Sequence, residues 1–563
     1  MSTIFTINKR AIDRVSDFFS KLSPKQWVVL ISSVLAVVVS TWSVYHGYSV
    51  AYGDAESHLN IAKRVIHSLT PGFAQLGGIW LPLPHIFLIP FVYFDFLWRT
   101  GIAGAIVSGV AYVISSLYVF KFIHLMTKNN MAAFFGAMIF VTNPNILYLQ
   151  STPMTELPLI VFFILSSYYF VRFLKDDDNV LYLILAAFFG FCASLSRYDG
   201  WALVMMEAGL IGLLYLYKSL WPVLKTENGI LGKIKKGFSS LWKNLEVFEG
   251  RLVIFSTLAF FGIALWLLWD FLILGDPLYF THSEFSANSQ QQDWDRRGEL
   301  PARHNIWVSF IYYFMNTVQS GGVVISIIAM VGLVMLLKDK LANSRFLITL
   351  LLLVPFFFNI TTLFMGQSVI FIPSVTPIDF EWTLFNVRYG ALMIAPIAIL
   401  SAYAFYRSRA SAKWLTSSLV IVQMGLFFIN FSPVLSFDDG VRGLSSATAK
   451  LPDAQFFLAR EYDYGMVLTD DFARTLSIIR TPIPMQNVIY IGNKPYWEES
   501  FVEPQKYARW IIIQKNDTLW QNMIDKPEVE GRLYAYFNRV YTSDEILIFR
   551  RINELSTTTP PTI

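Results

Sequence analysis

Long apolar runs separated by short polar segments fill the first 432 residues of the chain. Because the hydrocarbon core of a bilayer is about 30 Å thick, a helix needs roughly 20 mostly apolar residues to cross it. Runs of about this length predict eleven spanning helices, near residues 27–48, 101–120, 131–149, 156–174, 180–196, 201–217, 252–274, 321–337, 346–364, 389–406 and 414–432. The pattern therefore predicts a polytopic α-helical membrane protein.

After residue 432 the pattern changes to short β-rich runs that alternate with helical stretches. Residues Gly465–Thr469 and Trp510–Gln514 are two of the runs that predict strands. We therefore expect a transmembrane domain over 1–432 and a small α/β domain over 433–563. The last eight residues, 556–563, are rich in Ser, Thr and Pro, and this composition predicts a disordered end.

The composition supports a membrane location and limits the partners. Only 15% of the residues are charged, whereas 55% are hydrophobic and 16% are aromatic. The net charge of +4 is too small to indicate a nucleic-acid partner. No P-loop or Gly-rich dinucleotide motif occurs, which argues against an ATP-driven pump.

The distribution of Lys and Arg predicts the orientation. If the N-terminus is cytoplasmic, the inner segments hold 22 of the 44 Lys and Arg residues and the outer loops between spans hold 8. Loops rich in Lys and Arg stay in the cytoplasm. The chain is therefore expected to have a cytoplasmic N-terminus and an extracytoplasmic C-terminal domain.

The first outer loop carries Asp54, Glu56 and His58. Asp54 and His58 share one face if a helix starts near Asp54, and carboxylates suit the first turn of a helix. A purely structural interpretation is equally open for this loop alone. In it, Asp54 caps the helix, Glu56 is solvated and His58 is a packing residue.

Later outer loops add further charged side chains at the same membrane boundary. Glu156 stands at the head of a long apolar run, and Arg197 and Asp199 lie in a turn before the next outer-to-inner span. Arg388 and Tyr389 lie at the mouth of another span. The structural alternatives are a helix cap for Glu156, a local ion pair for Arg197 and Asp199, and snorkelling for Arg388.

The loop over residues 275–305 is long, polar and aromatic, and it includes Arg303. Such a loop is typical of a lid or a substrate gate, although a charged run is more often a solvated surface. Together the outer loops mix carboxylates with guanidinium groups. Guanidinium groups bind phosphate oxygens, and a carboxylate accepts a proton from a hydroxyl or holds a divalent cation.

At these residues the chain resembles the GT-C superfamily of membrane glycosyltransferases, which use lipid-phosphate-linked sugars as donors. It most strongly resembles the branch of protein O-mannosyltransferase-like and lipid A aminoarabinose transferase-like enzymes. The matching pieces occur in family order over about residues 1–432 and are Gly53–His58, Met154–Pro158, Arg197–Gly200, Gly275–Pro277 and Arg388–Tyr389.

The resemblance assigns roles to the outer-loop residues. It implies that Asp54 is the catalytic base, that Glu56 is a second acid, and that Arg197 and Arg388 contact the donor phosphate. The other residues that it implies line the substrate site are His58, Glu156, Asp199, Arg303 and Tyr389. This chain has Asp-Ala-Glu where the mannosyltransferases have adjacent Asp-Glu, so a divalent cation (Mg²⁺ or Mn²⁺) on Asp54 and Glu156 is left open.

The function that we expect is that of an inverting glycosyltransferase. It would move a sugar from a polyprenyl-phosphate-linked donor to a lipid, glycan or protein acceptor at the outer membrane face. One alternative is oligosaccharyltransferase-like transfer to protein, and another is a lipid flippase or transporter. Transporters place ionisable residues near the bilayer midplane. Here the charges gather at one membrane boundary, which favours the enzyme.

Overall fold

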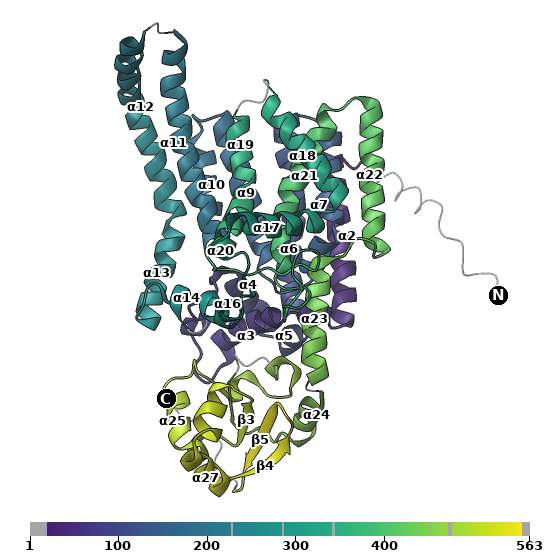
Figure 1. The fold of residues 1–563 in the computed structure, drawn as a ribbon, viewed down its shortest axis with the longest axis vertical. Helices are drawn as coiled ribbons and strands as arrows, with labels where there is room; N and C mark the ends of the chain where they lie inside the picture. The colour runs from purple at the N-terminus through teal and green to yellow at the C-terminus, as the bar shows by residue number, and fades with distance from the viewer. Residues whose placement is uncertain are drawn as a thin grey trace, which may run out of the picture.

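The computed structural model describes residues 20–226, 229–283, 286–339, 344–450, 452–470 and 476–553. Within these ranges, seven stretches are long and apolar enough to cross a membrane. They are α2 (Pro24–Tyr45), α6 (Ile102–Thr127), α9 (Glu156–Lys175), α11 (Asp199–Thr226), α12 (Ile230–Ala259) joined to α13 (Phe261–Leu274), η3 (Val387–Met393) joined to α21 (Ile394–Arg407), and α22 (Ala410–Phe428). These helices run side by side in a bundle (Figure 1).

Two bent helix pairs raise the number of spans among the described residues to as many as nine. The pair α17 (Ile306–Gly321) and α18 (Val323–Lys338) bends by 109°, and the pair α19 (Arg345–Leu352) and α20 (Val354–Phe364) bends by 45°. The expectation of a polytopic helical membrane protein is therefore confirmed.

Two of the eleven expected spans are shorter than a membrane crossing requires. The run 131–149 divides into α7 (Asn130–Thr142) and α8 (Pro144–Leu149). Pro144 has no N–H with which to continue α7, and the Asn143 side chain caps α8 instead. The run 180–196 gives α10 (Val180–Ser194), which has only 15 residues. A hydropathy pattern alone does not register such a break or shortening.

Short helices form a layer between the bundle and the sheet (Figure 1). They come from the first outer loop, as η1 (Tyr48–Val50), α3 (Gly53–His67), η2 (Phe73–Leu76), α4 (Leu83–Val92) and α5 (Asp95–Thr100), and from the loop before α17, as α14 (Tyr279–His282), α15 (Ala287–Gln290) and α16 (Gln292–Arg296). This layer holds several of the residues that the sequence singles out.

The C-terminal part of the chain contains a five-stranded sheet in the order β2-β1-β3-β5-β4. Its strands are β1 (Val467–Thr469), β2 (Val488–Ile489), β3 (Trp510–Gln514), β4 (Phe537–Thr542) and β5 (Ile546–Arg551). Strand β1 pairs in parallel with β2 and β3, whereas β5 pairs antiparallel with β3 and β4. The expected small α/β arrangement is therefore present. The boundary at residue 432 stays a prediction, and the expected disordered end, 556–563, lies outside the described residues.

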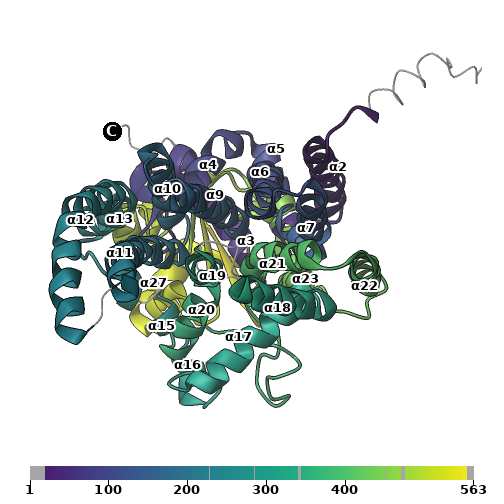
Figure 2. The ribbon, with the colours of Figure 1, turned by 90° about the horizontal axis from the view of Figure 1, so that it is seen from above.

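Helices surround this sheet and connect it to the bundle. They are α23 (Leu435–Lys450), α24 (Pro452–Glu461), η4 (Ile478–Arg480), η5 (Met485–Asn487), α25 (Tyr496–Val502), α26 (Pro504–Tyr507), η6 (Trp520–Ile524) and α27 (Pro527–Tyr536). From above, the bundle covers the sheet (Figure 2). One apolar core is continuous across the junction, since Leu59 and Trp98 of the first outer loop belong to the same buried cluster as Val467 and Trp510 of the sheet.

Candidate active site

Asp54 and Glu156 each lie in the first turn of a helix. Asp54 is the second residue of α3, and Glu156 is the first residue of α9. Carboxylates stabilise this end of a helix because the unpaired N–H groups there carry partial positive charge. Glu156 is fully buried, whereas 19% of the Asp54 side chain is exposed. Asp54 is therefore the carboxylate that a substrate can reach.

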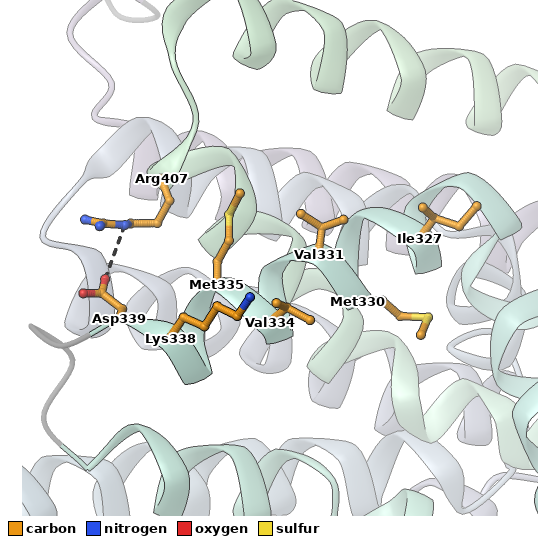
Figure 3. A pocket seen from close by; sticks show the side chains of 8 residues that line it. All are labelled: Ile327, Met330, Val331, Val334, Met335, Lys338, Asp339 and Arg407. Carbon is orange, nitrogen blue, oxygen red and sulfur yellow. Dashed lines mark ion pairs between the residues drawn. The ribbon is translucent and has the colours of Figure 1, made fainter.

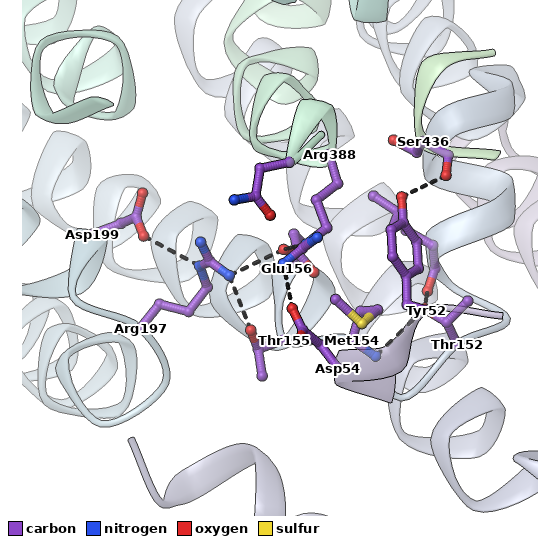
Figure 4. A network of polar contacts seen from close by, with 12 residues as sticks. Tyr52, Asp54, Thr152, Met154, Thr155, Glu156, Arg197, Asp199, Arg388 and Ser436 are labelled. Carbon is purple, nitrogen blue, oxygen red and sulfur yellow. Dashed lines mark hydrogen bonds and ion pairs between the residues drawn. The ribbon is translucent and has the colours of Figure 1, made fainter. Parts of the chain in front are cut away.

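Arg388 joins these two carboxylates across more than 230 residues of sequence. Its Nη2 lies 2.7 Å from Asp54 Oδ2, and its Nε lies 3.2 Å from Glu156 Oε1 (Figure 4). The arginine side chain is only 7% exposed. A buried guanidinium needs such partners, because an unpaired charge in the protein interior costs several kcal/mol.

Arg197 binds the same glutamate from the other side. Its Nη1 lies 3.0 Å from Glu156 Oε1 and 3.1 Å from Thr155 Oγ1, and its Nε lies 3.2 Å from Asp199 Oδ2 (Figure 4). Burial lowers the pKa of Arg197, but the carboxylates of Glu156 and Asp199 outweigh burial and raise it. Arg197 therefore stays charged.

Each arginine keeps one terminal nitrogen available. The hydrogen bonds of Arg388 use Nε and Nη2, and those of Arg197 use Nε and Nη1. Arg388 Nη1 and Arg197 Nη2 make no hydrogen bond within the described ranges. Neither atom is among the buried polar atoms that lack a partner. The network thus offers two guanidinium groups with unused donors.

Aromatic rings support the arginines. The guanidinium of Arg197 lies 4.9 Å from the centre of the Tyr389 ring, and that of Arg388 lies 5.2 Å from the same ring and 5.1 Å from that of Tyr52. Such cation–π contacts hold a guanidinium in place without using its N–H donors. Tyr389 therefore lies beside both arginines, as a substrate-lining residue would.

Glu56 and His58 make their hydrogen bonds with residues outside this network. His58 Nδ1 lies 2.9 Å from His85 Nε2 in a buried pair, and its ring lies 4.6 Å from that of Trp80. Burial, followed by His85, lowers the pKa of His58. Glu56 instead pairs with Arg480 of η4, whose Nε lies 2.6 Å from Glu56 Oε1, while burial raises the pKa of this glutamate against the effect of Arg480.

Arg303 is not one of the network residues. It forms an ion pair with Asp295 in its own loop. The loop nevertheless approaches the network elsewhere, since the Phe280 ring stacks at 5.0 Å on Tyr198, next to Arg197. The gating role expected for this loop stays a prediction.

Three residues near the network were not singled out in the sequence. Arg480 and Asp439 both belong to the C-terminal quarter of the chain, where the sequence shows no motif. Asp439 is 7% exposed, and burial raises its pKa to about 6 against the opposing effect of Arg388. Tyr52 OH donates to the Ser436 carbonyl oxygen at 2.5 Å and thereby ties α23 to the first outer loop. No signal in one sequence links positions so far apart.

The arrangement does not fit a divalent cation held by Asp54 and Glu156. Arg388 occupies the place between the two carboxylates, and Arg197 binds the same oxygen of Glu156. Among the described residues, no three His, Cys, Asp or Glu side chains gather closely enough to hold a metal ion. The cation stays a prediction, and no step below uses it.

Comparison with solved structures identifies the class of fold. The chain is similar to the crystal structure of ArnT from Cupriavidus metallidurans bound to undecaprenyl phosphate, with a TM-score of 0.52 and 11% identity over 91% of this chain and 97% of that one. ArnT in the apo state gives a TM-score of 0.51 at 12% identity, over the same shares of the two chains. The chain therefore has the fold of a GT-C membrane protein.

A match to a protein-family model covers part of the transmembrane region. Residues 87–242, which include Glu156, Arg197 and Asp199, match the family described as dolichyl-phosphate-mannose-protein mannosyltransferase. A search among curated protein sequences returned no match. The fold and this family segment both agree with the resemblance that the short motifs indicated.

Proposed function

We propose that the protein is an inverting glycosyltransferase that moves a hexosyl or related sugar from a polyprenyl-phosphate-linked donor to an acceptor hydroxyl. The observation that carries this proposal is the convergence of Arg388 on Asp54 and Glu156 and of Arg197 on Glu156, with one terminal nitrogen of each arginine making no hydrogen bond to the described residues. Guanidinium groups bind phosphate oxygens through paired N–H donors. The ArnT structure, solved with undecaprenyl phosphate, supports a lipid phosphate as the ligand.

Asp54 is the proposed base. Its carboxylate is paired with Arg388, and a neighbouring guanidinium makes a carboxylate a weaker proton acceptor. A lipid phosphate that binds Arg388 competes for that guanidinium, so the Asp54 carboxylate gains basicity as the donor arrives. Donor binding and activation of the base are then coupled through one arginine.

The transfer is a single in-line displacement. The acceptor oxygen forms a bond to the anomeric carbon while the bond from that carbon to the phosphate oxygen breaks, and the configuration inverts. The hydroxyl proton passes to Asp54, and the electron pair leaves on the polyprenyl phosphate. Arg388 and Arg197 stabilise the negative charge that develops on the leaving phosphate.

The position of the charges supports an enzyme rather than a transporter. Glu156 and Asp199 are the first residues of spanning helices, and Arg388 is the second residue of another span. Ionisable groups that line a transport path gather near the bilayer midplane. We place this boundary on the outer face, with the N-terminus in the cytoplasm, because the predicted inner segments are rich in Lys and Arg.

The experiment is a transfer assay with purified protein in vesicles, a labelled polyprenyl-phosphate sugar and the variant Asp54→Asn. Asn keeps the shape of Asp54 and an oxygen that accepts the hydrogen bond from Arg388, but it does not act as a base, so turnover should fall by about 10²–10⁴ while the protein stays folded. The control is Asp176→Asn, the same chemical change at the opposite end of α9. Wild-type turnover in Asp54→Asn would refute the assignment of the base.

A further inference from the structure

A basic pocket of about 410 Å³ lies among α2, α6, α7 and α9, and we define it by Lys25, Lys121, His124, Lys128 and Arg172. Arg172 follows Glu156 by 16 residues on α9, so it lies about 24 Å along that helix from the candidate active site. The basic pocket is therefore at the opposite end of the bundle and shares no residue with the network described above.

Among the described residues, no carboxylate lines the basic pocket. Elsewhere at this end of the bundle, Lys218 and Arg251 both bind Asp177, at 2.5 and 2.7 Å. The lysines and the arginine of the basic pocket make no ion pair within the described ranges. Four like charges around one cavity repel each other, and a bound anion removes that cost.

A second cavity at the same end of the bundle is also lined by basic residues, but one of them has a carboxylate partner. It has a volume of about 740 Å³ and is lined by an apolar stretch of α18 together with Lys338, Asp339 and Arg407 (Figure 3). There Asp339 Oδ2 lies 3.3 Å from Arg407 Nε, so the arginine already has its counterion. The part of the basic pocket that the structure describes contains no such counterion.

The surroundings of the basic pocket indicate a membrane headgroup region. Tyr168 lines the pocket, and its ring lies 5.3 Å from Tyr118 and 5.2 Å from Tyr169. Tyrosine clusters of this kind are typical of the level at which headgroups meet the hydrocarbon. In addition, His124 Nδ1 is buried without a hydrogen-bond partner in the described part of the chain. A buried polar atom left unpaired suggests a missing ligand group.

We propose that the basic pocket binds an anionic phospholipid through its phosphate headgroup. Basic pockets between membrane helices bind such headgroups, and each nearby Lys or Arg contributes about 1 kcal/mol. The acyl chains lie in the bilayer beside the exposed apolar face of α2, which includes Val34, Val37 and Val38. This site is separate from the proposed donor site and does not depend on the glycosyltransferase activity.

The test compares lipid binding to the full-length protein in detergent, by native mass spectrometry and by titration with fluorescent phosphatidylglycerol. Wild type should retain phosphatidylglycerol in preference to phosphatidylcholine. The double variant Lys121→Gln with Lys128→Gln should bind phosphatidylglycerol about 25-fold more weakly, at about fivefold per lysine. Lys121→Arg with Lys128→Arg keeps both charges and should keep the affinity.

The matched control is Lys235→Gln with Lys243→Gln, which removes the same charge from α12 outside the pocket. Equal phosphatidylglycerol binding in the two double Gln variants would overturn the proposal, because the effect would then be one of net charge alone. Competition by millimolar inorganic phosphate would also overturn it, in favour of a soluble anion. Undecaprenyl phosphate should bind the Gln variant at Lys121 and Lys128 as it binds wild type; its loss would make the basic pocket a donor site instead.

Discussion

Arg388 has two proposed roles, which are to brace the network and to bind the donor phosphate. Replacing Arg388 should affect both. Arg388→Ala removes hydrogen bonds to charged groups worth about 1.5–3 kcal/mol, so affinity for undecaprenyl phosphate should fall roughly 10- to 150-fold. It also leaves the fully buried Glu156 with one arginine instead of two. Breaking a buried ion pair costs about 3–5 kcal/mol of folding stability. Thermal unfolding and lipid binding must therefore be measured together.

Arg388→Lys and Glu156→Gln distinguish the two effects. Lysine keeps the charge but cannot bridge Asp54 and Glu156 as a planar fork does, so the fold should survive while donor affinity falls. Glu156→Gln removes a carboxylate that competes with phosphate for both arginines, so donor binding should become tighter. The control is Arg407→Ala, at the far end of α21, where a half-exposed ion pair is lost. Wild-type affinity for undecaprenyl phosphate in both Arg388 variants would refute the phosphate-binding role.

Three further predictions concern pH, metal and topology. The pKa of Asp439 is raised from 3.8 to about 6, so its contribution to folding stability is present at low pH and is lost as pH rises through 6. At 1.36 kcal/mol per pKa unit, the stability lost is about 3 kcal/mol. Asp439→Asn should therefore raise the melting temperature more at pH 8 than at pH 5. Transfer should persist in EDTA, because the Arg388 guanidinium lies between Asp54 and Glu156; loss of activity that Mn²⁺ restores would contradict this. Cysteines at Ser240 and Ser289 should be labelled from the cytoplasm and the exterior, respectively, and labelling of both from the same side would refute the predicted orientation.

Sequence patterns predicted the fold class because apolar runs report membrane crossing directly. They failed at α7 and α10, where a proline and a short run change the helix lengths without changing hydropathy. They also placed Asp54, Glu156, Arg197 and Arg388 at one membrane boundary, because the alternating direction of successive spans determines which helix ends lie on the same side. They did not show that Arg388 lies between two carboxylates, because distances across a bundle depend on packing.

Arg480, the partner of Glu56, shows why sequence reasoning missed residues near the site. Glu56 and Arg480 are 424 positions apart, and neither position shows a motif that names the other. An arginine in a small soluble-looking domain is usually a surface residue, and nothing local distinguishes Arg480 from such a residue. Glu56, the first-loop acid to which the resemblance assigned a catalytic role, therefore forms its ion pair with the C-terminal part of the chain.

That contact ties the C-terminal part to the first outer loop at more than one point. Arg480 also donates to the Val50 carbonyl at 3.2 Å, and Arg99 of α5 donates to the carbonyl oxygens of Ile479 and Ile483 at 3.3 and 3.1 Å. The two segments are therefore held together by several hydrogen bonds. A chimera that exchanges only the tail with a relative would disturb the helix that carries Asp54, whereas one that exchanges tail and first loop together would preserve it.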